Sequence, residues 1–236
     1  MLIKKMAALA VLSAVLGSAQ AAPITPTVNF LPGTTLNTTG LSTFTTGGAD
    51  MDGTSVTAYF SNGSSETAIW GTTGVSSGGA TGTGWSLSMN GATSFSDPWI
   101  LSNANNFMLT RLVIDGQPGS TIFDTILDPE TTPGSARGTA FSSVDGPSGL
   151  SVIATYLNQV ALNNVVYGDL YTVLDISFLG VTGGPGGLLG DLSFIADTDN
   201  TQLRGDITRV PEPASLALIG LALAGMGAVR RRRTQA

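Results

Sequence analysis

The side chains of this chain that could do chemistry are carboxylates and aromatic rings, because its 236 residues include no cysteine and no histidine. A cysteine nucleophile, a Ser-His-Asp triad and a histidine-ligated zinc are therefore excluded. Glycoside hydrolysis needs only two carboxylates about 5 to 10 Å apart across a cleft. The candidates are Glu66, Asp97, Asp115, Asp124 and Glu130. Most of them lie in sequence contexts typical of turns, so we expect no enzymatic activity.

Two Asp-x-Asp pairs are candidates for a calcium site. Asp50 and Asp52, and also Asp197 and Asp199, lie at alternate positions in segments predicted to be loops, where oxygen ligands can converge on a hard cation. Neither pair has the further ligands of an EF-hand loop. Asp and Asn also cap their own backbone in turns, which needs no metal. Asp197 and Asp199 are the better pair, and calcium is the only cofactor that the sequence suggests.

Four aromatic side chains could form a flat face that stacks on sugar rings: Tyr59, Trp70, Trp85 and Trp99. Trp and Tyr combine a large apolar area with one polar group, which suits carbohydrate binding. The same residues are equally suited to fill the space between two sheets. We favour the core position for the tryptophans and keep sugar binding as the alternative.

Short β-strands would have to position these side chains. Thr54 to Phe60 and Glu66 to Trp70 are rich in β-branched and aromatic residues and flank Asn62-Gly63, which is a strong hairpin signal because both turn residues tolerate positive φ. If Val56, Ala58 and Phe60 face the core, Tyr59 must face outward. Further strands are predicted at 84–89, 99–102, 107–115, 120–127, 150–156, 170–179 and 192–196. The prediction is a mainly β protein, an antiparallel β-sandwich with Gly/Ser/Thr-rich loops.

The segments between the strands are punctuated by Gly, Pro, Ser and Thr. Loops are predicted at 75–84, 128–138, 145–149 and 181–187. In 170–179, Leu174, Ile176 and Phe178 share one face, with Asp175 and Ser177 on the other. The apolar segment 159–167 fits either two strands turning at Asn163-Asn164 or one short helix.

The C-terminal segment 210–236 has three parts. Pro211, Glu212 and Pro213 come first, an uncharged apolar run follows at 214–229, and Arg230, Arg231, Arg232 and Arg233 come next. As a helix the run would be ~24 Å long, short for a ~30 Å hydrocarbon core. The arginines would stay on the cytoplasmic side and leave the preceding chain outside. A core helix with a solvated basic end is the alternative.

This arrangement resembles the PEP-CTERM sorting signal of Gram-negative bacteria. The resemblance implies recognition by an exosortase, which is a membrane enzyme, with transient anchoring in the inner membrane, processing near Pro-Glu-Pro, and release to the cell surface or the extracellular matrix. Strand segments such as SVTAYFSNGSSETAIW and LSFIADTDN resemble those of PEP-CTERM proteins of unassigned function. That second resemblance implies a fold and no activity.

The N-terminus predicts export independently. Lys4 and Lys5 precede an apolar run at 6–17, and Ala19-Gln20-Ala21 before Ala22 is typical of a signal peptidase site. An uncleaved membrane anchor is the alternative. The predicted organisation is a signal peptide at 1–21, an extracellular β-sandwich domain at 22–209, and a sorting signal with a transmembrane helix at 210–236.

The predicted exported part is strongly acidic. It has four arginines, no lysine and fifteen Asp and Glu residues, a net charge of 4 − 15 = −11. Nucleic acid is not expected as a partner, because phosphate binding needs a basic surface. The sequence therefore favours a structural or adhesive protein associated with exopolysaccharide or biofilm, and a carbohydrate-binding or calcium-stabilised recognition module is the alternative.

Overall fold

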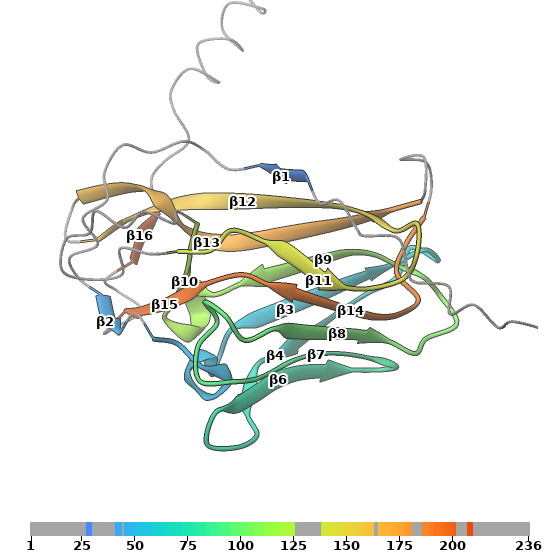
Figure 1. The fold of residues 1–236 in the computed structure, drawn as a ribbon, viewed down its shortest axis with the longest axis horizontal. Helices are drawn as coiled ribbons and strands as arrows, with labels where there is room; N and C mark the ends of the chain where they lie inside the picture. Colours follow the sequence, from blue (N-terminus) through green and yellow to red (C-terminus); the bar gives the residue numbers. More distant parts are fainter. Residues whose placement is uncertain are drawn as a thin grey trace, which may run out of the picture.

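A computed structural model of the chain describes residues 27–29, 41–43, 45–125, 138–162, 165–180, 186–201 and 207–209. These residues form two β-sheets with short connections, which confirms the predicted mainly β class (Figure 1). Two short 3-10 helices occur among them, η1 (Gly48–Met51) and η2 (Gln117–Gly119). Side chains from both sheets meet in one buried core, so the described part is a β-sandwich.

The larger sheet has ten strands and is centred on β13. Its strands are β1 (Thr27–Asn29), β2 (Leu41–Thr43), β3 (Ser55–Phe60), β4 (Ser65–Ile69), β9 (Leu109–Asp115), β10 (Thr121–Asp124), β12 (Ser151–Leu162), β13 (Val165–Leu179), β15 (Thr198–Thr201) and β16 (Ile207–Arg209). One edge of β13 pairs with β12, and the other pairs with β9 and then with β10. From there β9 leads to β3 and β4, and β10 leads to β15 and β2. Among the described pairs only β1 with β12 is parallel.

The smaller sheet has six strands in the order β11-β14-β8-β7-β6-β5. They are β5 (Gly71–Thr72), β6 (Ser77–Gly82), β7 (Trp85–Asn90), β8 (Trp99–Asn103), β11 (Ser142–Asp145) and β14 (Gly190–Ile195). All of these pairs are antiparallel. The chain passes from β4 in one sheet to β5 in the other through Trp70 alone, so this residue lies at a corner of the sandwich.

The alternation of apolar and polar residues builds the core as the sequence predicts. On β3, Val56, Ala58 and Phe60 are buried, and the residues between them are partly exposed. On β13, Leu174, Ile176 and Phe178 are buried in the same core. Asp175 and Ser177 lie on the opposite, partly exposed face. Each strand thus contributes one apolar face to the sandwich and turns the other away from it.

The hairpin between β3 and β4 is confirmed, but its turn differs from the prediction. Gly63 has a φ of +84°, and Asn62 is not among the residues with positive φ. The Gly63 N–H donates to the Phe60 carbonyl oxygen at 3.0 Å, and the Phe60 N–H donates to that of Ser64 at 2.9 Å. This longer turn needs left-handed backbone only at the glycine. The Asn62 side-chain oxygen instead accepts the Ser64 N–H at 3.0 Å.

Three segments of ambiguous or loop-like sequence are strands. The described residues of segment 159–167 belong to a strand pair rather than a helix, because Leu162 at the end of β12 lies opposite Val165 at the start of β13. The prediction of a loop at 75–84 is wrong, because most of this segment is strand β6. The reason is close packing: a Cβ on Gly78 would lie 2.0 Å from the Gly48 carbonyl oxygen and 2.3 Å from Trp70 Nε1. The predicted loop at Asp199 is strand β15. The predicted loops at 128–138 and 181–187 lie largely outside the described residues.

Candidate functional site

The three tryptophans are buried in the core, which is the position that the sequence favours for them, and the alternative of a flat sugar-stacking face does not fit their burial. Trp70, Trp85 and Trp99 have exposed fractions of 1%, 3% and 0%. Their rings fill the space between the sheets, where Trp70 meets Trp99 edge to face with ring centroids 5.1 Å apart. Each indole N–H has an acceptor, as a buried Trp requires. Trp70 donates to the Gly48 carbonyl oxygen at 2.8 Å, and Trp99 donates to that of Ala196 at 3.0 Å.

Trp85 takes part in a polar contact between the two sheets. Its Nε1 donates to Glu66 Oε2 at 2.9 Å, and Glu66 lies on β4 of the larger sheet. The Thr83 N–H and hydroxyl donate to the same carboxylate at 2.9 and 3.2 Å. The Thr83 N–H, then the Trp85 indole, hold the pKa of Glu66 below its usual value. This carboxylate joins β4 to the β6–β7 turn, which is a structural role.

Tyr59 lies on the outer face of the larger sheet, as the alternation on β3 predicts. It is opposite Arg111 on β9, and the Arg111 guanidinium carbon lies 5.1 Å from the centre of the Tyr59 ring. Arg111 Nε and Nη2 donate to the two carboxylate oxygens of Asp175 on β13, at 2.8 and 2.6 Å. Hydrogen bonding to Asp175 raises the pKa of Arg111. Three adjacent strands thus present an aromatic ring, a guanidinium and a carboxylate side by side.

This cluster, which we call the Tyr59–Arg111–Asp175 patch, is the best placed binding surface among the predicted site residues. The Arg111 side chain is 44% exposed and that of Asp175 is 14% exposed. Next to it, the hydroxyls of Thr57 and Thr67 are 2.9 Å apart. A partly exposed tyrosine beside hydrogen-bonding groups can bind a hydroxyl-rich ligand, although the guanidinium covers one face of the ring. Sequence reasoning singled out Tyr59 and missed Arg111 and Asp175, since only the strand register brings these three together.

Asp197 and Asp199 are buried rather than placed on an open loop. Asp197 directly precedes β15, and Asp199 lies within it opposite Ile122 of β10. Their exposed fractions are 2% and 0%. Asp197 Oδ1 accepts the Ser94 hydroxyl and the Thr198 N–H, both at 2.9 Å. Among the described residues no group of three His, Cys, Asp or Glu side chains could hold a metal ion.

Burial gives Asp197 an unusual protonation equilibrium. Desolvation raises its pKa from 3.8 to about 7, against the opposing effect of the Ser94 and Thr198 hydrogen bonds. Burial likewise raises the pKa of Asp169, at the same end of the larger sheet, to about 6. The Thr198 hydroxyl donates to Ser94 Oγ at 2.9 Å, so the Asp197 network ties β15 to the loop that leads into β8. These hydrogen bonds connect the two sheets and have a structural role.

Two of the remaining catalytic candidates, Asp97 and Asp115, also have structural roles. Asp97 accepts the Thr93 N–H at 3.2 Å, and Asp115 accepts the Gln117 N–H at 3.1 Å, both within turns. In the other calcium candidate, Asp50 accepts the Gly47 N–H at 2.8 Å. Asp124 is fully buried. Glu130 lies outside the described residues.

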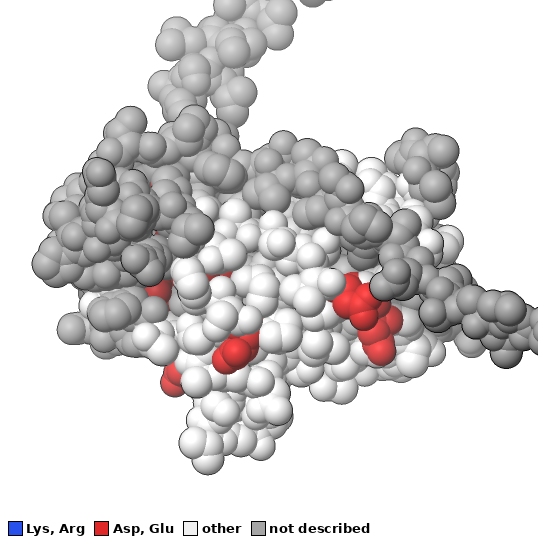
Figure 2. Space-filling view, viewed as in Figure 1, with Lys and Arg blue, Asp and Glu red and all other residues white. Residues whose placement is uncertain are grey.

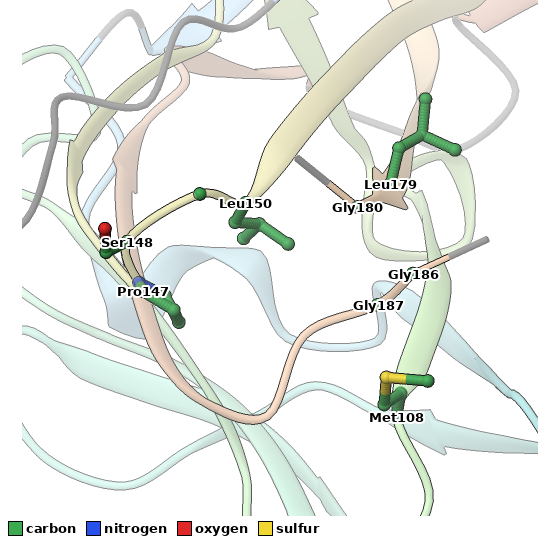
Figure 3. A pocket seen from close by; sticks show the side chains of 9 residues that line it. Met108, Pro147, Ser148, Leu150, Leu179, Gly180, Gly186 and Gly187 are labelled. Atoms are coloured by element: carbon green, nitrogen blue, oxygen red, sulfur yellow. The ribbon is translucent and has the colours of Figure 1, made fainter. Parts of the chain in front are cut away.

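A small pocket lies at the end of the sandwich, away from these carboxylates. Its volume is about 210 Å³, and Figure 3 shows Met108, Leu150 and Leu179 around the opening. The rest of its lining consists of Pro147, Ser148, Gly149, Gly180, Gly186 and Gly187. No titratable side chain is among these described lining residues, and the space suits a small apolar group.

The described surface is acidic, as the composition predicts. Figure 2 shows one face of the molecule, on which the coloured side chains are all Asp or Glu. Arg111 is paired with Asp175, so it adds little local positive charge.

The predicted processing signals lie outside the described residues. This applies to Ala19, Ala21 and Ala22, to Pro211, Glu212 and Pro213, and to Arg230, Arg231, Arg232 and Arg233. In the described part of the chain, no helix is both long enough and apolar enough to cross a membrane. The predicted signal peptide and transmembrane helix stay predictions.

Comparison with known proteins identifies the C-terminal signal. Residues 209–233 match the PEP-CTERM protein-sorting motif, which confirms the resemblance drawn from the sequence. No curated protein matches the chain, and no solved structure matches it either. The motif implies an exported protein that is processed by an exosortase, a membrane protein, and then resides at the surface or outside the cell.

Proposed function

We propose that the exported sandwich is a non-catalytic structural or adhesive protein of the cell surface or extracellular matrix, in association with exopolysaccharide. The observation that carries the proposal is the sorting motif at 209–233, attached to an acidic domain whose candidate carboxylates serve its own fold. Glu66 connects the two sheets, and Asp97 and Asp115 stabilise turns. Asp197 is buried and accepts a hydrogen bond from the Ser94 hydroxyl. These hydrogen bonds support a structural role for the four carboxylates rather than a catalytic one.

The experiment has two parts. In the first, the matrix fraction of the producing cell is separated from the culture medium and from washed cells, and the mature protein is quantified in each. The proposal predicts enrichment in the matrix, and a protein found only in the medium contradicts it. In the second, purified protein is incubated with the isolated exopolysaccharide. We expect no new reducing ends, and their time-dependent release would show an enzyme.

A carbohydrate-binding module is the second candidate, and the Tyr59–Arg111–Asp175 patch favours it. Its planar ring and paired charged groups offer an apolar contact together with donors and acceptors for sugar hydroxyls. Retention on immobilised exopolysaccharide separates the two candidates. If the patch binds glycan, Tyr59→Ala and Arg111→Ala each abolish retention while Thr73→Ala, remote from the patch on the smaller-sheet side, leaves it unchanged. Equal retention of all three variants assigns adhesion to another surface.

A further inference from the structure

The outer edge of strand β12 is paired in two places, with short strands from opposite ends of the predicted exported domain. β13 covers one edge of β12 over most of its length. On the other edge, β1 pairs with Ile153 to Thr155, and β16 pairs with Val160 to Leu162 (Figure 1). The antiparallel register of β16 places Thr208 opposite Ala161. The last described residues before the sorting signal are therefore part of the sheet.

The sorting motif begins where this strand ends. The motif covers residues 209–233, and Arg209 is both its first residue and the last residue of β16. Pro211 is only two residues further along the chain, a reach of at most ~7 Å. Proteolytic enzymes act on backbone that is not held in hydrogen-bonded structure. With β16 paired, the first residue of the motif is held in the sheet, which limits the backbone that an enzyme can bind next to Pro-Glu-Pro.

β16 can leave the sheet without unfolding the domain. It is three residues long, lies at the sheet edge and pairs only with β12 among the described strands. Short terminal elements of this kind open at a small fraction of the global free energy of unfolding. When opening and closing are fast, the rate of proteolysis follows the population of the open form. The stability of one strand pair is thus able to set the rate of processing.

We propose that β16 must separate from β12 before the sorting motif is processed, and that it pairs with β12 again afterwards to close the edge of the mature domain. The partner is the membrane-bound exosortase, so the proposal rests on the proposed sorting of the chain. It adds that the substrate is the chain with β16 undocked. Pairing also protects the mature protein, since an unpaired β12 edge is a template for association with another chain.

A disulfide between the two strands tests the proposal. The chain has no cysteine, so Ala161→Cys with Thr208→Cys introduces two thiols that can pair only with each other within one chain. Directly opposed residues of an antiparallel pair have Cβ atoms close enough for a disulfide, and export exposes them to oxidising conditions. Processing is followed in the producing cell by pulse-labelling and by the loss of mass at the C-terminus. We expect the double variant to be processed at least about tenfold more slowly than wild type, in line with its smaller open population.

Three controls make the result decisive. Each single cysteine variant should be processed at the wild-type rate, and a reducing agent should restore processing of the double variant. Insertion of six Gly/Ser residues after Arg209, which moves the motif away from the locked strand, should restore processing even with the disulfide formed. The proposal is overturned if the oxidised double variant is processed as fast as the single variants, or if the insertion fails to restore processing.

Failure of the sorting assignment gives a different pattern. If the wild-type chain keeps residues 210–236 in its extracellular form, the sorting signal is not processed, whatever the state of β16. If the wild type is processed and replacement of Glu212 by alanine prevents processing, the sorting assignment holds. The strand proposal is then judged by the disulfide alone. A thermal melt of the reduced double variant, matched to wild type, verifies that the substitutions leave the sandwich folded.

Discussion

Replacement of Asp197 by asparagine should make the protein more stable at neutral pH and flatten its pH dependence. Asp197 is 2% exposed, and burial raises its pKa to about 7 in the folded state. In the unfolded chain the pKa is close to 3.8. The folded state therefore binds more protons than the unfolded state between about pH 4 and 7. The contribution of this group to stability is fully present below pH 3.8 and is lost as the pH rises through 7.

The size of the effect follows from the interval between the two pKa values. Each pH unit within it changes the free energy of unfolding by ~1.4 kcal/mol. About three units separate 3.8 from 7, so ionisation of Asp197 costs up to ~4 kcal/mol above pH 7. Asparagine has the same shape and keeps an oxygen that can accept the Ser94 hydroxyl and the Thr198 N–H. It has no charge to desolvate.

The assay is urea unfolding of wild type and Asp197→Asn from pH 4 to pH 8. We expect the difference in free energy of unfolding to change with pH by about 1.4 kcal/mol per unit near pH 5 to 6, in favour of the variant as the pH rises. Comparing the two proteins cancels the contributions of Asp169 and of the other carboxylates, which are common to both. Parallel pH profiles, or a variant that is less stable than wild type at pH 8, would refute the reasoning.

Three further predictions test the assignment of side chains to core and surface. Phe60→Ala should lower the free energy of unfolding by about 3 to 5 kcal/mol because it empties a buried position, whereas Tyr59→Ala on the outer face should change it by about 0.5 kcal/mol or less. Equal losses of the two variants in urea unfolding would contradict the assignment of these side chains to opposite faces of β3. Tryptophan emission should be blue-shifted and unaffected by added exopolysaccharide, since all three rings are buried, and quenching would show that one of them binds the sugar. Calcium added to a chelated sample should leave the melting temperature unchanged, because Asp197 accepts hydrogen bonds from the protein. A rise in melting temperature that Asp199→Ala abolishes would instead show that calcium binds at these carboxylates.

The sequence predicts those parts of the fold that depend on local patterns. The alternation at Val56, Ala58 and Phe60, and again at Leu174, Ile176 and Phe178, is a direct consequence of burying one face of a strand. The hairpin at Gly63 follows from backbone freedom at that glycine. The sorting motif is equally local, and the comparison with known proteins confirms it.

Features that depend on long-range packing were not predictable in this way. Strand β6 has the composition of a loop, and its Gly78 is explained only by the close approach of Gly48 and Trp70. Asp197 has the sequence context of a turn, yet it is buried because Ser94, 103 residues away, supplies a hydroxyl. The Tyr59–Arg111–Asp175 patch requires the registers of three strands at once. In each case the partner is distant in the sequence, and periodicity alone does not identify it.

The most direct test of the central claim, that this sandwich is exported and sorted through its C-terminal motif, is the intact mass of the extracellular protein. Loss of residues 1–21 and of the segment that carries Arg230 to Arg233 predicts a domain that begins at Ala22 and ends near Pro-Glu-Pro, just after β16. The predicted result is a single mass, before any glycan is counted, that corresponds to this processed chain. An extracellular species that still carries the four arginines would contradict the account.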